Sequence, residues 1–283
     1  MPDRSDRGII FDIERFAITD GPGIRTTVFF KGCPLRCAWC QNPEGMSPRP
    51  ELLFHEHLCV HCGRCAVACP TGVHEVTSGG HVLYRERCAA TGLCARECPA
   101  HALELAGHAV TATEVMEVVL RDDAFYRKSG GGITLSGGEP MMQPEFAKAL
   151  LTSARERRLH TAVDTSGFAP WEAFEEILGL VDLFLYDVKD TDDRRHKEHT
   201  GVEFAPILDN LRRLDAAGAK ILLRCIIVPG VNDDKRHLDR LAEIRRTIRR
   251  VIGIETLQYH SLGLPKWRAL GKAALARDFS KRP

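Results

Sequence analysis

Residues 26–40 read TTVFFKGCPLRCAWC, an apolar run that leads directly into a loop with three cysteines. The run Thr26–Lys31 is rich in β-branched and aromatic residues, as buried parallel strands are. Cys33, Cys37 and Cys40 follow with the spacing C-x3-C-x2-C. Three thiolates on one tight loop can bind three irons of a 4Fe–4S cube and leave the fourth iron open to a small chelating molecule. A zinc site with a fourth ligand from elsewhere is the alternative.

Downstream of this loop, short apolar runs alternate with helical patterns. The further expected strands are Ile133–Ser136, Thr161–Asp164, Leu183–Asp187, Ile221–Val228 and Glu255–Tyr259. The expected helices are Thr113–Arg121, Gln143–Arg158, Pro170–Gly179, Ala205–Ala217 and Lys235–Arg249. Repeated β/α units predict an α/β fold, either a parallel barrel or a doubly wound sheet. Six units are fewer than the eight that close a full barrel.

Unusual polar residues and glycines follow the ends of these strands. They are Gly137, Gly138 and Glu139 after the second strand, Asp164, Thr165 and Ser166 at the third, Asp187 and Lys189 at the fourth, Arg224 on the fifth and His260 after the sixth. Parallel β/α folds place their sites at the carboxyl ends of the strands. We therefore expect these residues and the three-cysteine loop on one rim of the molecule.

A segment over residues 53–106 has a different composition, rich in Cys, Gly, Ala and Pro, and contains two similar halves. CVHCGRCAVACPTGVHEV (residues 59–76) contains the bacterial ferredoxin run, and CAATGLCARECPAHALEL (residues 88–105) repeats it imperfectly. In two-cluster ferredoxins the fourth cysteine of each run ligates the other cluster. That rule assigns Cys59, Cys62, Cys65 and Cys98 to one cluster, and Cys69, Cys88 and Cys94 to the other.

The second half has Thr91 where a cysteine is expected. The second site therefore holds a 3Fe–4S cluster, a cube with a non-cysteine ligand, or nothing. Hydroxide, water or the Thr91 oxygen are the candidate ligands. A zinc-bound structural module is the alternative for the whole segment.

Composition excludes several other classes of protein. The 283 residues include 39 Lys and Arg against 38 Asp and Glu, a net charge of +1, which argues against a nucleic-acid partner. No apolar stretch is long enough to span a membrane, and the start of the chain lacks the pattern of a signal peptide, so we expect a cytoplasmic protein. Of the 11 cysteines, only Cys225 lies outside residues 33–98, and we expect it in the core.

The motifs, in their order along about residues 8–270, resemble the glycyl radical enzyme activating enzymes of the radical S-adenosylmethionine superfamily. The matching runs are DGPGIRT (20–26), KGC (31–33), WCQNPE (39–44), LSGGEP (135–140), DTSGF (164–168), DVK (187–189), RCIIVPGVND (224–233) and YHSLG (259–263). The resemblance implies a partial (β/α)6 TIM-like barrel with an inserted small ferredoxin-like iron–sulfur domain. Its parts are residues 1–52, the insert at 53–106, and residues 107–283.

The resemblance also implies a reaction. S-adenosylmethionine chelates the open iron, reductive cleavage gives a 5′-deoxyadenosyl radical, and this radical takes hydrogen from a backbone glycine of a partner protein. The expected catalytic residues are Cys33, Cys37, Cys40 and Lys189. The expected S-adenosylmethionine contacts are Trp39, Gly137, Gly138, Glu139, Asp164, Ser166, Lys189, Arg224 and His260. Asp164, Thr165 and Asp187 match a monovalent cation site, and Asp20 and Arg25 match a partner contact.

The insert bears on the partner and on electron supply. The activating enzyme of pyruvate formate-lyase lacks such an insert, so a dehydratase, decarboxylase or lyase is the favoured partner. We expect a monomer in which one or two insert clusters relay electrons from flavodoxin or ferredoxin. A radical enzyme acting on another peptide or a small molecule is the second hypothesis. A pure electron carrier is the third, and it leaves the C-x3-C-x2-C loop unexplained. The tail after Trp267 matches the family poorly.

Overall fold

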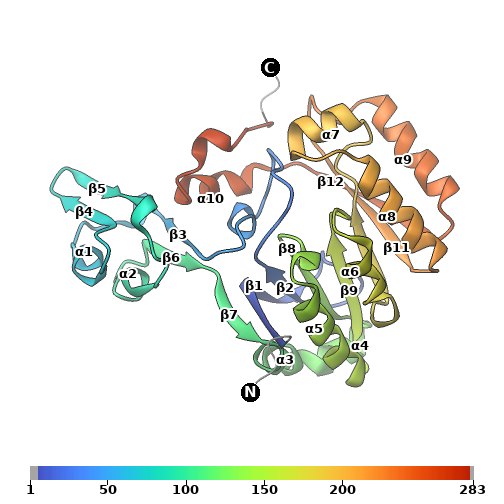
Figure 1. Ribbon diagram of the computed structural model, residues 1–283, viewed down its shortest axis with the longest axis horizontal. Coiled ribbons are helices and arrows are strands. Elements are labelled where there is room, and N and C mark those ends of the chain that lie inside the picture. The colour runs from blue at the N-terminus through green and yellow to red at the C-terminus, as the bar shows by residue number, and fades with distance from the viewer. Residues whose placement is uncertain (1–5, 281–283) are drawn as a thin grey trace.

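The computed structural model describes residues 6–280, and its core is an eight-stranded sheet (Figure 1). The strand order is β12-β11-β10-β9-β8-β2-β1-β7. The six parallel strands are β2 (Arg25–Phe30), β8 (Gly132–Gly137), β9 (His160–Thr165), β10 (Leu183–Asp187), β11 (Ile221–Ile227) and β12 (Val251–Gln258). All six correspond to expected strands. Within residues 6–280 no strand pairing joins β12 to β7.

Two strands that were not expected extend the β2 edge. β1 (Arg7–Ala17) runs antiparallel to β2, and β7 (His108–Thr111) runs antiparallel to β1. β1 alternates buried and exposed residues over much of its length, so it lacks the continuous apolar run of the parallel strands.

Helices cover the sheet on its outer face. Figure 1 shows α5 (Pro144–Glu156), α6 (Trp171–Glu175), α8 (Ala205–Ala216) and α9 (Lys235–Thr247) along this face. These four and α3 (Ala112–Val119) correspond to expected helices, and Thr111 caps α3 through a capping box with Glu114. The helices α4 (Asp123–Ser129), α7 (Asp193–Thr200) and α10 (Leu264–Ala269) were not expected.

The pleat of the parallel strands separates two kinds of side chain. Val163, Phe184 and Leu223 belong to the main core, which includes the outer helices. Ala162 and Leu185, one position away, belong to a small cluster on the opposite face of the sheet. Residues two positions further along each strand continue that inner face towards the carboxyl ends. The polar residues of the site lie on this inner face, at the carboxyl ends of the strands.

Residues between β3 (Glu51–Phe54) and β6 (Leu103–Ala106) form a separate lobe beside the sheet (Figure 1). β3 and β6 pair antiparallel at the base of the lobe, and β4 (His74–Thr77) and β5 (Gly80–Leu83) form a hairpin. The short helices α1 (Arg64–Ala68) and α2 (Leu93–Arg96) carry cysteines of the two runs. Buried Leu52, Cys65, Val73, Cys94 and Leu103 form its small core.

The divergent tail supports this lobe. Arg85 donates to the Leu52 carbonyl at 2.5 Å and to the Ala269 carbonyl, at the end of α10, at 2.6 Å. Leu270 packs with Leu53 and Ala106 in a small cluster. The segment after Trp267 therefore stabilises the base of the lobe. No helix among residues 6–280 is long and apolar enough to cross a membrane.

Candidate active site

The three-cysteine loop lies at the carboxyl end of β2, and two elements outside the loop hold it. The Arg36 and Ala38 amides donate to the carbonyls of Thr200 and His199, at the end of α7, at 2.7 and 2.9 Å. The Trp267 indole N–H, on α10, donates to the Cys40 carbonyl at 3.1 Å. The sequence predicted the loop but not these two helices, which fix its path.

The chemistry of the three thiols fits a metal cluster. Burial raises the pKa of Cys37, and burial with the nearby Cys37 raises the pKa of Cys40 to about 12. For Cys33, burial comes first and repulsion from Cys37 and Glu139 adds to it, so its pKa is raised as well. Buried thiols of this kind ionise when a cation binds them, and metal loading then releases their protons. None of the cysteines within residues 6–280 forms a disulfide.

Gly137 and Gly138 pass close to protein backbone. A Cβ on Gly137, whose φ is +107°, would lie 2.3 Å from the Phe30 nitrogen, and one on Gly138 would lie 2.3 Å from the Gly32 oxygen. The close approach seen here is to protein backbone, and the expectation that these glycines also make room for a ligand stays a prediction. They let the end of β8 pack against the segment that leads into the cysteine loop.

Glu139 joins the ends of β8 and β9. Its fully buried carboxylate accepts from the Thr165 hydroxyl at 2.8 Å, and from the Ser166 amide at 2.8 Å and hydroxyl at 2.6 Å. Burial raises its pKa, whereas these hydrogen bonds favour the ionised form. The carboxylate is thus used within the protein, and the Glu139 amide donates to the Gly32 carbonyl at 2.8 Å.

Lys189 connects the end of β10 to the cysteine loop. Its ammonium donates to Asp187 Oδ2 at 2.7 Å. Burial works against its charge, but Asp187 and the sulfurs of Cys37 and Cys33 outweigh that effect and raise the pKa of Lys189. The Lys189 ammonium therefore lies close enough to the Cys37 and Cys33 sulfurs to interact with them electrostatically.

Arg224 lies among carboxylates on the inner face of the sheet. Its guanidinium is 3.4 Å from Asp164 Oδ2, 3.4 Å from Glu255 Oε2 and 3.9 Å from Asp20 Oδ1. Burial lowers its pKa, but Asp164, Asp187, Asp20 and Glu255 together raise it above the ordinary value.

The inner face carries an excess of negative charge. Four carboxylates there meet only two cations, Lys189 and Arg224, within residues 6–280. Asp164 accepts from the Ser136 hydroxyl at 2.7 Å through Oδ2, while its buried Oδ1 has no hydrogen-bond partner in the part of the chain that the structure describes. Burial raises the pKa of Asp164 to about 7 despite the opposing effect of Arg224. A cationic group completes such a cluster, and S-adenosylmethionine has both a sulfonium and an ammonium.

The structure does not bring the three expected cation ligands together. Asp164 and Asp187 lie on the inner face, but Thr165, one position after Asp164, points to the opposite face. The Thr165 hydroxyl donates to Glu139 there. The expectation that this hydroxyl joins both carboxylates around one cation is wrong, because adjacent residues in a strand alternate faces.

Arg25 is a buried structural residue. It is 0% exposed and donates to Thr134 Oγ1 and the Ile133 carbonyl, both at 2.6 Å, and to the Pro22 carbonyl at 3.0 Å. It lies at the amino end of β2, whereas the cysteines follow the carboxyl end. The expectation that Arg25 touches a partner is therefore wrong. Asp20 accepts from the Thr27 hydroxyl at 2.8 Å and belongs to the inner carboxylate cluster.

Trp39 and His260 occupy different surroundings. Trp39 is 2% exposed and packs near the rings of His199 and Phe279, and its buried Nε1 has no hydrogen-bond partner within residues 6–280. His260 is exposed, and its carbonyl accepts from the Gln41 side chain at 2.7 Å. Trp39 is therefore a buried residue of the cysteine loop itself, whereas His260 lies at the surface and contacts Gln41, the residue that follows the loop.

The cysteines of the lobe gather around two pockets. Cys59, Cys62, Cys65 and Cys98 line the first, and Cys69, Cys88 and Cys94 line the second, together with Thr91. The exchange of fourth cysteines between the runs is thus visible in the geometry. We call these the first and second insert pockets.

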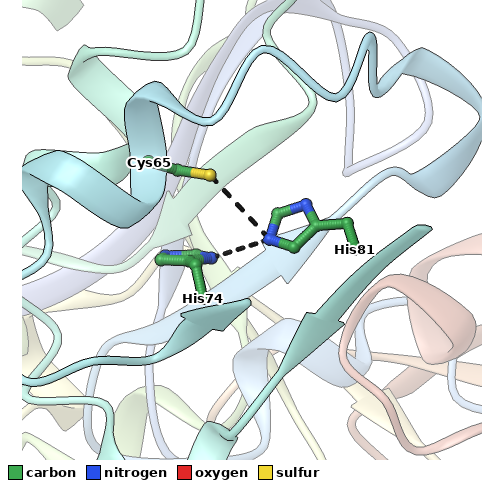
Figure 2. A group of neighbouring side chains, drawn as sticks. All are labelled: Cys65, His74 and His81. Atoms are coloured by element: carbon green, nitrogen blue, oxygen red, sulfur yellow. Dashed lines mark hydrogen bonds between the residues drawn. The ribbon is translucent and has the colours of Figure 1, made fainter. Parts of the chain in front are cut away.

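Sequence reasoning missed two histidines beside these pockets. His81 Nδ1 lies 3.5 Å from Cys59 Sγ, and His81 Nε2 lies 3.0 Å from His74 Nδ1 and 3.8 Å from Cys65 Sγ (Figure 2). Burial is the largest cause of the lowered pKa of both rings, and for His74 the value falls to about 4. Their sequence signal was weak, because each stands alone in a short strand.

Comparison with known proteins identifies the family. A family described as "Radical SAM superfamily" matches residues 88–242, and one described as "4Fe-4S binding domain" matches residues 53–73. The choline trimethylamine-lyase activating enzyme of Oleidesulfovibrio alaskensis is 42% identical over 94% of this chain and 87% of its own length. The isethionate sulfite-lyase activating enzyme of Nitratidesulfovibrio vulgaris is 41% identical over 97% of this chain and 91% of its own.

Other similar proteins are named for related partners. The benzylsuccinate synthase activating enzyme of Thauera aromatica is 40% identical over 94% of this chain and 82% of its own length. A solved domain of a pyruvate-formate lyase-activating enzyme from Bacteroides vulgatus is 30% identical, with a TM-score of 0.45, and covers 52% of this chain and 97% of that domain. On the sequence relatives, this chain belongs to the glycyl radical enzyme activating enzymes of the radical S-adenosylmethionine superfamily.

Proposed function

We propose that Cys33, Cys37 and Cys40 hold a 4Fe–4S cluster to which S-adenosylmethionine binds for reductive cleavage. The 5′-deoxyadenosyl radical so formed removes a hydrogen atom from a backbone glycine of a partner glycyl radical enzyme. The observation that carries this proposal is the placement of three cysteines, with Cys37 buried and Cys33 and Cys40 half-buried, on one loop next to Lys189 and the inner carboxylates.

When bound, the cluster supplies the electron that breaks a carbon–sulfur bond of S-adenosylmethionine. The residues of this chain bind and orient that molecule. Lys189 and Arg224 offer positive charge to the methionine carboxylate, and Asp164 Oδ1 is free to accept from the ammonium. Glu139 and the two glycines support the site indirectly, because they hold the end of β8 against the cysteine loop. The buried Glu139 side chain also helps to keep water from the reacting atoms.

The fold and the lobe add to this proposal. The six parallel strands are the β/α units of a partial (β/α)6 barrel, interrupted by a ferredoxin-like insert at residues 53–106. The insert holds one or two iron–sulfur clusters that relay electrons from flavodoxin or ferredoxin. Asp164 and Asp187 remain candidates for a monovalent cation near the methionine carboxylate, without the Thr165 hydroxyl.

The partner is a dehydratase, decarboxylase or lyase of the glycyl radical class. Relatives named for choline trimethylamine-lyase, isethionate sulfite-lyase and indoleacetate decarboxylase support this choice over pyruvate formate-lyase. We further propose that the protein is a cytoplasmic monomer that meets its partner transiently.

An anaerobic assay tests the proposal. The protein is reconstituted with iron and sulfide, mixed with S-adenosylmethionine and a strong reductant, and assayed for 5′-deoxyadenosine. Wild type should form it, and Cys37→Ala should form none, while the control Cys225→Ala should retain activity because Cys225 lies in the main core. Retained turnover in Cys37→Ala, or none in a fully loaded wild type with candidate partners present, would refute the assignment. A glycyl radical signal in electron paramagnetic resonance (EPR) then identifies the partner.

A further inference from the structure

The two halves of the insert differ at two positions that face the same pocket. Aligned on their cysteines, Thr91 replaces the equivalent of Cys62, and His74 replaces the equivalent of Leu103. His74 begins β4 and Leu103 begins β6, so the two occupy matching places in the two halves. Leu103 lines the first insert pocket, whereas His74 lines the second, where the cysteine is missing. A ligand is lost and a possible ligand gained at one site.

A hydrogen-bond chain indicates which nitrogen of His74 carries a lone pair. His81 Nδ1 is 3.5 Å from the sulfur of Cys59. When that sulfur is a thiolate, it can only accept, so His81 carries its proton on Nδ1. His81 Nε2 faces both His74 Nδ1, at 3.0 Å, and Cys65 Sγ, at 3.8 Å, and we take the shorter contact as the hydrogen bond, in which His81 Nε2 accepts and His74 donates from Nδ1. The remaining nitrogen of a neutral His74, Nε2, therefore presents a lone pair.

That lone pair has no partner in the protein. His74 is 7% exposed, and its buried Nε2 makes no hydrogen bond within residues 6–280. Figure 2 shows this nitrogen on the side of the ring away from His81, and His74 lines the second insert pocket. A buried acceptor without a donor is unfavourable, so we expect such a group to have a partner.

We propose that His74 Nε2 is a ligand of an iron–sulfur cluster held by Cys69, Cys88 and Cys94. The inference rests on the proposed function of the insert as an iron–sulfur unit and deepens it. A neutral imidazole in place of a thiolate makes the cluster one unit less negative, and such replacement raises the reduction potential, as in Rieske centres. The second site is then the more readily reduced of the two.

Two other arrangements are alternatives. Thr91 is exposed, and its hydroxyl lies 3.5 Å from the Leu93 amide, so it does not need a metal as a partner. Cys65, His74 and His81 also lie close enough to hold one metal ion together. That ion would remove Cys65 from the first cluster, and zinc analysis of the purified protein detects it.

The test uses the full-length protein, reconstituted without S-adenosylmethionine so that no nitrogen reaches the radical cluster. Wild type is compared with His74→Leu, which places in the second half the residue that the first insert pocket already accommodates. His81→Phe is the matched control, since it removes the hydrogen-bond partner but keeps His74. Samples are measured oxidised by continuous-wave EPR and reduced by pulsed EPR, with iron and zinc analysis.

The proposal expects strong nitrogen coupling to a reduced cluster in wild type and His81→Phe, and its loss in His74→Leu. His74→Leu should also lose about one iron per chain and gain the 3Fe–4S signal when oxidised. Thr91→Cys combined with His74→Leu should recover the iron. A 3Fe–4S signal in wild type, or nitrogen coupling that is unchanged in His74→Leu, overturns the assignment of His74 as a ligand. Either result still leaves an iron–sulfur cluster in the second insert pocket. If the second insert pocket holds no iron in wild type or in Thr91→Cys, or if the protein contains stoichiometric zinc, both the cluster and its His74 ligand are overturned.

Discussion

Replacing Arg25 by methionine separates a structural role from a role in partner binding. Methionine keeps an unbranched, apolar side chain in the space and removes the guanidinium. The change leaves Thr134 Oγ1 and the carbonyls of Ile133 and Pro22 without the donors that now reach them at 2.6, 2.6 and 3.0 Å. We expect a loss of stability in the isolated protein, with no partner present.

The magnitude follows from two opposing effects. Hydrogen bonds to a charged group contribute about 1.5–3 kcal/mol each, so the three together contribute about 6 kcal/mol. Burial lowers the pKa of Arg25 to about 10, which means that its charge is held at a cost of about 3 kcal/mol. The free energy of unfolding should therefore fall by about 3 kcal/mol, within the range for breaking a buried polar network.

Urea denaturation of the apo-protein, followed by circular dichroism, measures this loss. Arg25→Lys should lie between wild type and Arg25→Met, because it keeps the charge but not the fork of donors. Ile18→Ala is the surface control, since Ile18 is 76% exposed and its removal should leave the midpoint unchanged. The reasoning fails if Arg25→Met unfolds at the wild-type urea concentration and instead only weakens activation of a glycyl radical partner.

Three further changes test the site and its supports. Gly138→Ala places a methyl group 2.3 Å from the Gly32 oxygen, next to the cysteine loop, and should lower the iron content by about four atoms per chain. The control Gly179→Ala meets no atom within 4 Å and should keep its iron, which iron analysis measures. Arg224→Gln should weaken binding of S-adenosylmethionine at least about tenfold, because it removes one of the two cations that we propose for the methionine carboxylate; calorimetry measures this affinity, and an unchanged value would place the carboxylate elsewhere. Burial lowers the pKa of His237 below 6.5, so the unfolded chain takes up its proton first as the pH falls. The stability of the apo-protein should therefore be complete above about pH 6.5 and decline below it, and His237→Gln should show a shallower decline in denaturation at pH 7 and pH 5.

The sequence predicted all six parallel strands of the sheet, for a physical reason. A parallel strand is buried on both faces and appears as an unbroken apolar run, as in Leu183–Asp187, whose bounds agree with β10. β1 has charged residues facing solvent, so it lacked that signal. α7 has the sequence DRRHKEHT and no apolar face, and periodicity does not detect such a helix. Its signals were the caps, Asp192 before it and Gly201 after it.

In the site, the sequence predicted where residues lie along the fold but not which atoms they contact. The position of the cysteine loop followed from its place after a strand, and the pairing of insert cysteines followed from the ferredoxin rule. The contact that Gly138 makes could not be predicted in this way, because a glycine in a sequence indicates a close approach but not the group that is approached. His74 and His81 were missed because their meaning depends on a hairpin that brings residues of β4 and β5 together.

Pleat, more than proximity in sequence, decides which side chains form the inner cluster. Ser136 on β8 lies opposite Asp164 on β9, and Asp187 on β10 pairs with Arg224 on β11, so polar residues from four strands meet on one face. Thr165 adjoins Asp164 in the chain but serves the other face, where it fixes Glu139. A motif such as DTSGF therefore contributes to two structures at once. Its aspartate shapes the charge that meets the substrate, and its hydroxyls hold the strand end that supports the cluster loop, so changes at neighbouring positions should affect ligand affinity and loop stability separately.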